Sequence, residues 1–217
     1  MDDPKVALSE LAHHLYRKGW MEGTGGNLSL RQGNRIYITS SGLHKGRILP
    51  EEILEMTPEG TPLSPGQIRP SAETSIHVAL YTILPKVGAI IHVHTPEAVI
   101  ASTFGQSKLN LPPLEVIKGL GHKNPETAPP IPIFENDLSV ETIAENIKLR
   151  LEKVRSPLPA LLIRHHGTTA WGETLDDALR HIELVEFCFR VIAGSSPLSP
   201  PAVLLPAPTH TRGSRTH

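Results

Sequence analysis

The sequence predicts an α/β fold, and three features of its 217 residues indicate it. Short apolar runs rich in β-branched residues, typical of buried strands, alternate with longer segments whose apolar residues recur at helical spacing. No internal repeat interrupts this alternation. A hydrophobic content of 39% in a chain of this length is enough for one complete core. We therefore expect one folded domain over residues 1–194.

The first expected elements are a helix and a β-hairpin. Apolar residues recur near helical spacing over residues 6–18. Residues 27–30 and 35–39 then alternate between apolar and polar types around a Gly33-Asn34 turn. This pattern predicts a hairpin with glycine-rich loops at its open end.

The middle of the chain predicts a helix, a strand and a second helix. Residues 71–84 show helical spacing, with Ser71 as a candidate cap and Pro85 as the limit. Residues 87–95 are short, apolar and β-branched, as in a buried strand, and Thr95 can cap a helix that follows directly. The strand is therefore expected to end at the start of the next helix.

The last part of the chain predicts an irregular stretch, two helices and one strand. We expect residues 110–132 to be irregular and residues 139–154 to form a helix. Residues 160–172 predict a buried strand that runs into a glycine turn, and residues 174–192 predict a long helix. Residues 195–217 are rich in Pro, Ser and Thr, so we expect a flexible tail without a packed core.

Charge and composition exclude several classes of partner. Twenty-one basic residues face 22 acidic ones, which leaves no basic footprint for nucleic acid or an acidic membrane. The single cysteine, Cys188, excludes an intramolecular disulfide. There is neither an apolar N-terminal signal region nor a run of about 18 apolar residues. We therefore expect a cytoplasmic protein with a small-molecule partner, and no nucleic-acid or membrane partner.

A pair of histidines at the end of the predicted strand is a candidate metal site. His92 and His94 are one residue apart, so on a strand both point to one face while Val93 points into the core. Neutral imidazoles on one face can bind a divalent ion together at about 2.0–2.1 Å. By itself the pair fits hydrogen-bonded structural histidines equally well.

A second source of histidine strengthens the metal hypothesis. Residues 164–167, RHHG, also end an apolar stretch, where the loops of α/β sheets gather functional groups. We prefer His166 as the ligand because Gly167 beside it allows a sharp turn and a close approach to the metal. His165 is then expected to lie in the core or behind the site. Three histidines leave a position open on the ion, as a catalytic metal that polarises a carbonyl requires.

Such chemistry also needs a proton carrier and an anchor for the substrate. Glu73 and Glu115 are the candidate carriers, although each alone also fits a solvated surface carboxylate. The loops GTGGNLS and TSSGLHKG flank the hairpin, and residues 69–71 open a helix. Hydroxyls, backbone N–H groups and a helix N-terminus suit a phosphate dianion, and Lys45 adds charge. Neither loop fits a nucleotide-binding pattern, and ordinary hairpin turns remain an alternative.

Five motifs in order resemble those of the class II aldolase/adducin family: GTGGNLSLR, ITSSGLHKG, RPSAETSIH, IHVHT and RHHGTTAWG. The resemblance covers roughly residues 6–192. It implies a three-layer α/β/α fold with a central, mainly antiparallel sheet, and usually a homotetramer with sites near subunit interfaces.

Further segments resemble one branch of this family: LPPLEVIKGLGH, IPIFEND and HHGTTAWGETLDDALRHIELVEF. That branch dehydrates 5-methylthioribulose 1-phosphate to 2,3-diketo-5-methylthiopentyl 1-phosphate in methionine salvage. The resemblance implies the same lyase activity for this chain, with a sugar phosphate as the substrate.

The resemblance also implies roles for individual residues. By matching position, one Zn²⁺ per subunit is expected on His92, His94 and His166, and Glu115 is expected to be the acid/base residue. Glu73 matches the carboxylate that the aldolases use as metal ligand and base, and we expect it near the substrate. The expected phosphate-binding positions are Gly26, Asn27, Ser41, Gly42, Lys45 and Ser71.

Two features of these positions refine the expectation. Ala72 stands where the aldolases usually have a second serine, which removes one phosphate hydroxyl, and Lys45 can compensate. Glu115 or a zinc-linked base would take a proton from C3 of the substrate, and the protonated carboxylate would then assist the loss of the C4 hydroxyl as water. That dual role suits a carboxylate partly buried beside apolar neighbours such as Ile117.

Two other functions remain open at this point. An aldolase would cleave a related ketose 1-phosphate with the same metal and phosphate residues, and only Glu115 and the Trp171-Gly172 pair favour the dehydratase. Adducin-like relatives are non-catalytic binding modules. Loss of the metal histidines would mark such a module, and all three are present here.

Overall fold

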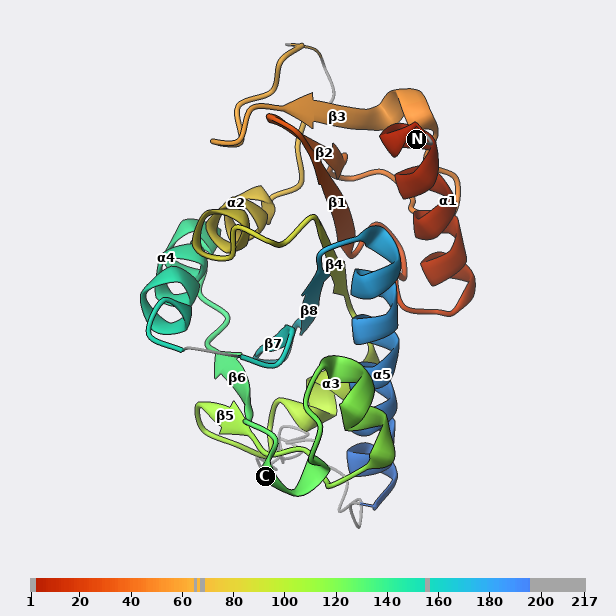
Figure 1. Ribbon diagram of the computed structural model, residues 1–217. Helices are drawn as coiled ribbons and strands as arrows, with labels where there is room; N and C mark the ends of the chain where they lie inside the picture. The colour runs from red at the N-terminus through yellow and green to blue at the C-terminus, as the bar shows by residue number, and fades with distance from the viewer. Residues whose placement is uncertain (1–2, 65, 67–68, 155–156, 196–217) are drawn as a thin grey trace, which may run out of the picture.

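The computed structural model describes residues 3–64, 66, 69–154 and 157–195 (Figure 1). Its elements, with η for 3₁₀ helices, are α1 (Pro4–Arg17), β1 (Asn27–Gln32), β2 (Arg35–Thr39), η1 (Pro50–Glu52), β3 (Ile53–Met56), α2 (Thr74–Ile83), β4 (Ala89–Val93), α3 (Pro96–Ala101), β5 (Lys108–Leu109), η2 (Glu115–Leu120), η3 (Pro125–Thr127), β6 (Ile131–Phe134), α4 (Val140–Leu151), β7 (Ala160–Ile163), β8 (Gly167–Gly172) and α5 (Leu175–Ser195).

One sheet organises these elements. Its strand order is β3-β2-β1-β4-β8-β7-β6-β5, and β6 and β7 form the parallel pair among otherwise antiparallel neighbours. The expectation of a central, mainly antiparallel sheet is confirmed. Strand β4 lies in the middle, between β1 and β8, so residues at its end are surrounded by loops from both halves of the sheet.

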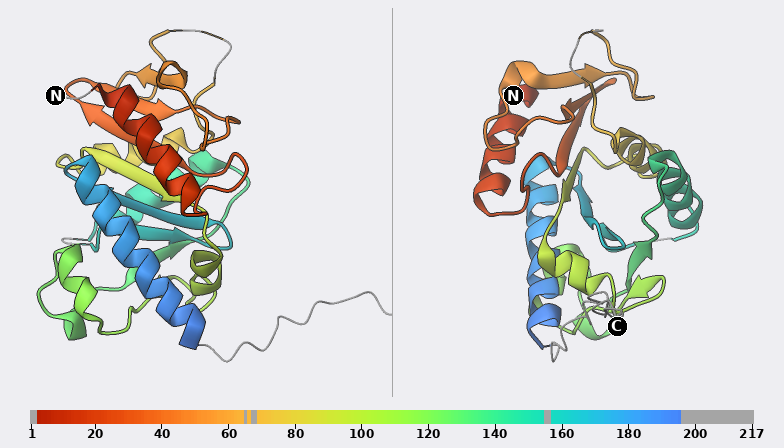
Figure 2. Two further views of the ribbon diagram at one scale, coloured as in Figure 1. Left: turned by 90° about the vertical axis from the view of Figure 1, so that its right-hand side faces the viewer. Right: turned by 180° about the vertical axis from the view of Figure 1, so that it is seen from behind.

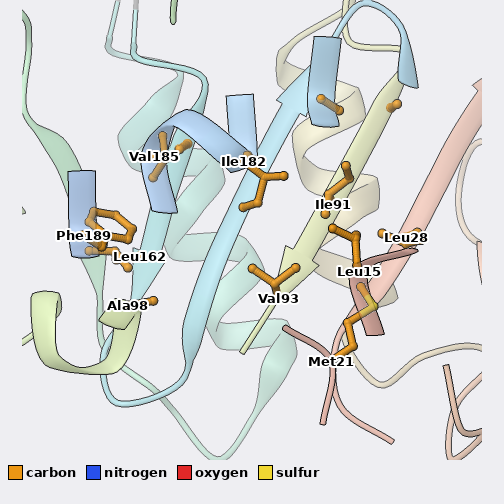
Figure 3. Close-up of a cluster of buried hydrophobic side chains, with 14 of the residues drawn as sticks. Leu15, Met21, Leu28, Ile91, Val93, Ala98, Leu162, Ile182, Val185 and Phe189 are labelled. Carbon is orange, nitrogen blue, oxygen red and sulfur yellow. The ribbon is translucent and has the colours of Figure 1, made fainter. Parts of the chain in front are cut away.

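Helices cover both faces of this sheet, which confirms the three-layer α/β/α arrangement. Figure 2 shows α1, α3 and α5 on one face and α2 and α4 on the other. Each face has its own buried apolar cluster: one includes Leu15 of α1 and Phe189 of α5, the other Leu80 of α2 and Ile147 of α4. Figure 3 shows the first cluster, where Val93 points into the core as predicted.

The helices begin where the sequence provides caps. Asp3 accepts a hydrogen bond from the N–H of Lys5 and starts α1, Thr95 accepts from Ala98 and starts α3, and Ser139 starts α4 in the same way. These side-chain oxygens satisfy N–H groups that have no partner within a helix. The predicted hairpin and the helices α1, α4 and α5 are present close to their expected bounds, and α3 begins at Pro96 directly after Thr95, as expected.

Four local features differ from what the sequence predicts. Helix α2 begins at Thr74 with Glu73 as its N-cap residue, and Ser71 instead accepts a hydrogen bond from the N–H of Glu73 outside the helix. The stretch 110–132 contains the 3₁₀ helices η2 and η3 and the start of β6. Strand β3 was not predicted, because its four residues, ILEM, are too short a run to give a periodic signal and do not alternate.

The fourth correction concerns residues 160–172, which form two strands instead of one. The turn 164–166 separates β7 from β8, and the two strands pair antiparallel. His165 in this turn has φ +53°, a left-handed conformation that is uncommon for a residue other than glycine. The chain therefore reverses at the histidines, and His166 is presented at the turn.

Two further findings concern the ends and the helices. The predicted boundary at residue 194 falls one residue before the end of α5, and the predicted tail beyond Ser195 lies outside the described residues. Within the described part of the chain, none of the helices combines the length and the apolar character that crossing a membrane requires.

Candidate metal centre

Four side chains that are far apart in the sequence meet at the end of β4. Glu73 caps α2, His92 lies in β4, His94 follows that strand directly, and His166 lies in the turn between β7 and β8. One potential ligand atom from each residue lies within 4.8 Å of those of the other three. The structure therefore brings together the three predicted histidines and Glu73, which was expected near the substrate.

The contacts within this cluster are short and converge on one point. Glu73 Oε1 lies 2.9 Å from Nε2 of His166 and 3.3 Å from Nε2 of His92. The Nε2 atoms of His92 and His94 are 2.8 Å apart. The three imidazole rings are arranged edge to face, with centroids 4.6–5.1 Å apart. All three rings thus present Nε2 to the same small space beside the carboxylate.

The protonation states suit a cation. Burial lowers the pKa of His94 to about 3, and repulsion by His92 and His166 acts in the same direction, so the ring is neutral near pH 7. Burial raises the pKa of Glu73, but attraction by His92 and the hydrogen bonds with His166 and His92 outweigh it and hold that pKa well below its ordinary value. Neutral imidazoles and an ionised carboxylate are the donors that zinc uses in proteins.

The facing ring nitrogens also favour a shared ion. If both Nε2 atoms of His92 and His94 lack a proton, their lone pairs repel at this distance, and only one proton can be shared between them. A cation between the nitrogens removes the conflict. The residues present therefore fit a divalent metal, with Glu73 placed to act as a further ligand or as a base.

Neighbouring groups orient the cluster. Thr169 Oγ1 lies 3.0 Å from Nδ1 of His92; in the tautomer with the proton on Nδ1, the ring donates to the hydroxyl and leaves Nε2 free for a metal. The carboxamide of Asn27 donates to Oε2 of Glu73, and the N–H of His94 donates to the carbonyl of Trp20 at 2.9 Å. These partners orient the side chains of His92 and Glu73 and hold the backbone of His94 before a metal binds.

Three glycines allow this close packing. A Cβ on Gly25 would lie 2.8 Å from Nδ1 of His94, and one on Gly26, which has φ +72°, would lie 2.9 Å from the carbonyl oxygen of His92. A Cβ on Gly167 would lie 2.2 Å from the carbonyl oxygen of Val93. Gly167 is therefore required for the approach of β8 to β4, and not for the sharp turn that the sequence suggested.

The neighbouring residue His165 does not match its expected place. Its side chain is exposed, so the expectation that it belongs to the core is wrong. Its backbone N–H donates to Oγ of Ser102 at 3.0 Å, which holds the left-handed turn in place. Arg164 donates to the carbonyl of Ser102 as well and pairs with Glu135, so the turn that carries His166 is fixed from outside the sheet.

The predicted phosphate positions come from loops that lie beside one another. The N–H of Ser41 donates to the carbonyl of Arg69, and Ser40 forms an isolated bridge with Pro70, so the loop with Ser41 and Gly42 lies against the segment that leads to Ser71. The side chain of Ser41 is exposed. Gly26 and Asn27 lie at the metal cluster itself, as their contacts with His92 and Glu73 show.

Lys45 is buried and engaged by backbone carbonyls. Its Nζ donates to the carbonyls of Leu43, Thr24 and Ser40 at 2.9, 3.2 and 3.3 Å. Burial lowers the pKa of Lys45, and attraction by Glu73 opposes this in part. Lys45 therefore joins the two loops near the cluster, and its contact with a phosphate stays a prediction.

Glu115 lies outside the four-residue cluster. It is the first residue of η2, its side chain is 79% exposed, and its carboxylate pairs with Nζ of Lys118 at 2.7 Å. The expectation that Glu115 is partly buried by apolar neighbours is wrong. In this single chain, the carboxylate beside the histidines belongs to Glu73.

Sequence reasoning did not identify Thr169 or Gly25 as parts of the site. The signal for Thr169 lies in the alternation along β8, because Thr169 is in register with His92 on the neighbouring strand. The signal for Gly25 is only the glycine-rich run itself, since the packing against His94 depends on how two distant loops meet.

Known proteins resemble this chain in sequence and in fold. The model of the Class II Aldolase and Adducin N-terminal domain matches residues 6–193. A methylthioribulose-1-phosphate dehydratase of Microcystis aeruginosa is 40% identical over 206 residues, 92% of this chain and 100% of that protein. The dehydratase of the same name from Leptospira biflexa is 36% identical over 197 residues, 86% of this chain and 94% of the relative.

A solved structure supports the same architecture. An L-fuculose 1-phosphate aldolase aligns with a TM-score of 0.75 at 23% identity, covering 93% of this chain and 92% of that one. At this level of identity the likeness concerns the fold alone. The relatives in sequence thus match this chain over most of their length, and the solved structure shares its fold.

Proposed function

The chain belongs to the class II aldolase and adducin family, and from this premise we propose that it is a hydro-lyase that dehydrates 5-methylthioribulose 1-phosphate. The product would be 2,3-diketo-5-methylthiopentyl 1-phosphate, and the reaction would serve methionine salvage. The observation that carries the proposal is the cluster of Glu73 with three histidines in a chain that matches dehydratases over most of its length.

The proposed metal is one zinc ion per subunit, held by His92, His94 and His166. When bound, this ion would supply a Lewis acid that polarises the carbonyl of the substrate. Three imidazoles with their Nε2 atoms turned to one point support this role. Thr169 would keep His92 in the tautomer that binds a metal.

The protein's own groups would carry the proton transfers. The reaction removes a proton from C3, breaks the C4–O bond with protonation of the leaving hydroxyl, and ends with the enol becoming the diketone. Glu73 is ionised and lies within 3.3 Å of two imidazoles, so it can hold the substrate's hydroxyls or accept a proton at the site. Asn27, which donates to Glu73, would keep that carboxylate turned inward.

Glu115 keeps its proposed role as the acid/base residue in an assembled form of the protein. Its exposed carboxylate on η2 can reach a metal centre when a second copy packs over that centre. Such packing agrees with the proposed homotetramer, whose sites lie near subunit interfaces. The same proposal includes phosphate binding by Ser41, Gly42 and Ser71, and a cytoplasmic location.

An aldolase that cleaves a ketose 1-phosphate is the second candidate. The contact of Glu73 with His92 and His166 favours it, because the aldolases use the matching carboxylate as metal ligand and base. The two reactions differ in the bond that breaks: C4–O in the dehydratase, and the C3–C4 bond in the aldolase.

A product assay separates these candidates. The zinc-loaded protein would be incubated with 5-methylthioribulose 1-phosphate, and the diketone and dihydroxyacetone phosphate would be measured in the same sample. Diketone without dihydroxyacetone phosphate is the expected result. Dihydroxyacetone phosphate would establish the aldolase instead, and neither product in the presence of bound zinc would contradict both.

A further inference from the structure

A second buried carboxylate lies behind the metal centre, on the helix that covers the sheet. Glu186 is in the middle of α5, and its residue exposure is 1%. Apolar residues share this buried face of the helix, among them Ile182, Val185 and Phe189. Burying a carboxylate on such a face is costly unless hydrogen bonds satisfy both oxygens, so its partners are informative.

Both oxygens of Glu186 are satisfied by threonine hydroxyls. Oε2 accepts from Oγ1 of Thr95, and Oε1 accepts from Oγ1 of Thr168, each at 2.6 Å. Thr95 Oγ1 also accepts from the N–H of Ala98 as the cap of α3, so its own proton is directed to Glu186. One carboxylate thus links two strand ends by two short hydrogen bonds.

These two threonines belong to the segments that carry the metal-binding histidines. Thr95 follows His94 in the chain, and Thr168 comes two residues after His166. Thr168 is also paired with Val93 in the ladder between β4 and β8. Glu186, on α5, therefore bridges the segment that carries His94 and the segment that carries His166.

The charges around Glu186 do not explain its burial. The pKa of Glu186 is raised to about 7, and burial is the largest cause. The hydrogen bonds from Thr168 and Thr95 lower this pKa in part. The charge of Glu97 raises it and that of Arg190 lowers it. A group with this environment would be replaced by an apolar residue at little cost if it served packing alone. What its two hydrogen bonds do is join the segments of Thr95 and Thr168.

We propose that Glu186 is a positioning residue that, through Thr95 and Thr168, fixes the spacing between His94 and His166 and thereby the affinity and geometry of the metal site. This inference rests on the proposed metal function. Glu186 itself touches neither the metal nor the substrate. Its effect is expected in metal binding first, and in turnover only as a consequence.

The test compares three variants of the full-length protein after removal of metal. Glu186→Met has a similar length and breaks both hydrogen bonds, whereas Glu186→Gln can still bond both hydroxyls if Thr168 accepts from the carboxamide. Ile182→Ala, one turn away on the same buried face, is the matched control for a loss of packing. Zinc affinity is measured by competition with a chromophoric chelator, and cobalt substitution reports coordination geometry in the visible spectrum.

We expect Glu186→Met to weaken zinc binding by about 10-fold and to change the cobalt spectrum, as loss of an orienting partner does. Ile182→Ala should lower the melting temperature and leave both readouts unchanged, and Glu186→Gln should restore them to near the unmodified values. If Glu186→Met does not fold, Thr168→Val, which removes one hydroxyl from the pair at nearly constant size, should give a smaller change in the same direction.

Other outcomes would overturn the inference. Zinc affinity within 2-fold of the unmodified protein and an unchanged cobalt spectrum in Glu186→Met, or in Thr168→Val where the former does not fold, would show that the spacing does not depend on Glu186. Equal losses in Ile182→Ala would show a general packing effect. Failure of the unmodified protein to bind zinc or cobalt would instead overturn the proposed metal function, and the inference with it.

Discussion

His166 Nε2 lies 2.9 Å from Oε1 of Glu73, and this contact joins the turn between β7 and β8 to the N-cap of α2. His92 approaches the same oxygen to 3.3 Å from β4. One buried carboxylate oxygen therefore meets two imidazoles, one from strand β4 and one from the turn between β7 and β8. A cation placed among these groups would satisfy all of them, whereas a solvated surface glutamate would form no such contact.

Replacing Glu73 by glutamine tests the role of its charge. Glu73→Gln keeps the size of the side chain and the contact with Asn27, but it removes the negative charge beside His92 and His166. We expect zinc affinity to fall at least about 10-fold and turnover to fall about 100-fold or more. Isothermal titration and steady-state kinetics measure the two. Glu10→Gln, on the exposed side of α1, is the control, and equal behaviour of both variants would refute a role for the charge.

The exposed carboxylate of Glu115 gives a separate prediction. Glu115→Gln should retain one zinc per chain and a normal melting temperature, because its side chain contacts only Lys118 on the surface of the described chain. If it is the acid/base residue, turnover should fall by about 100-fold or more. Metal analysis and a kinetic assay check this, with Glu126→Gln in η3 as the control. Full turnover with zinc retained would remove Glu115 from the mechanism.

Gly167 controls the approach of two central strands, and its replacement should cost stability. A Cβ at this position would lie 2.2 Å from the carbonyl oxygen of Val93, a backbone atom that cannot move without disrupting the sheet. We expect Gly167→Ala to lower the free energy of unfolding by about 3 kcal/mol in urea titrations of the metal-free protein. Gly194→Ala, in α5 with open space around its Cα, should be neutral or slightly stabilising. Equal midpoints for the two variants would contradict the close approach.

The stability of the metal-free protein should depend on pH through Glu186. Burial raises its pKa from 4.5 to about 7, so the folded state holds the proton between these values while the unfolded state loses it. Stability from this group is therefore present below pH 4.5 and is lost as pH rises to about 7. Glu186→Gln cannot titrate, so the difference in unfolding free energy between variant and unmodified protein should grow over this range by up to about 3 kcal/mol.

Urea titrations at pH 5, 6, 7 and 8 measure this difference. The prediction fixes the direction of this difference: Glu186→Gln should become more stable relative to the unmodified protein as the pH increases. A difference that shrinks with increasing pH would mean that Glu186 is held ionised in the folded protein and that its pKa is lowered, not raised.

Much of the fold could be predicted because local signals agree with the tertiary structure. The helices have caps and apolar faces, and the hairpin has its Gly33-Asn34 turn. The pairing of β7 with β8 could not be predicted in this way, because the reversal is made by His165 in a left-handed conformation that its type does not favour. A histidine in a short polar turn gives no local signal that separates a strand end from a hairpin.

The site could be predicted only where the ligands are marked by short-range spacing. His92 and His94 are one residue apart on a strand, and His166 is next to a glycine. All three histidines could therefore be predicted from the sequence. Glu73 was a candidate proton carrier, matched to a metal ligand only through the family resemblance, and it joins the cluster through the packing of α2; Glu186 resembles an exposed glutamate in an amphipathic helix. Their burial depends on contacts between distant segments, which no local pattern encodes.

The measurement that tests the account most directly is a zinc titration of the metal-free protein, with bound zinc and diketone formation followed in the same samples. We expect turnover to rise linearly with zinc and to reach a plateau at one ion per chain. The variant His94→Ala should bind little zinc and stay inactive throughout, since it lacks one of the three imidazoles around Glu73. Turnover that is independent of zinc, or zinc binding that His94→Ala does not weaken, would contradict the assignment of this cluster as the catalytic metal centre.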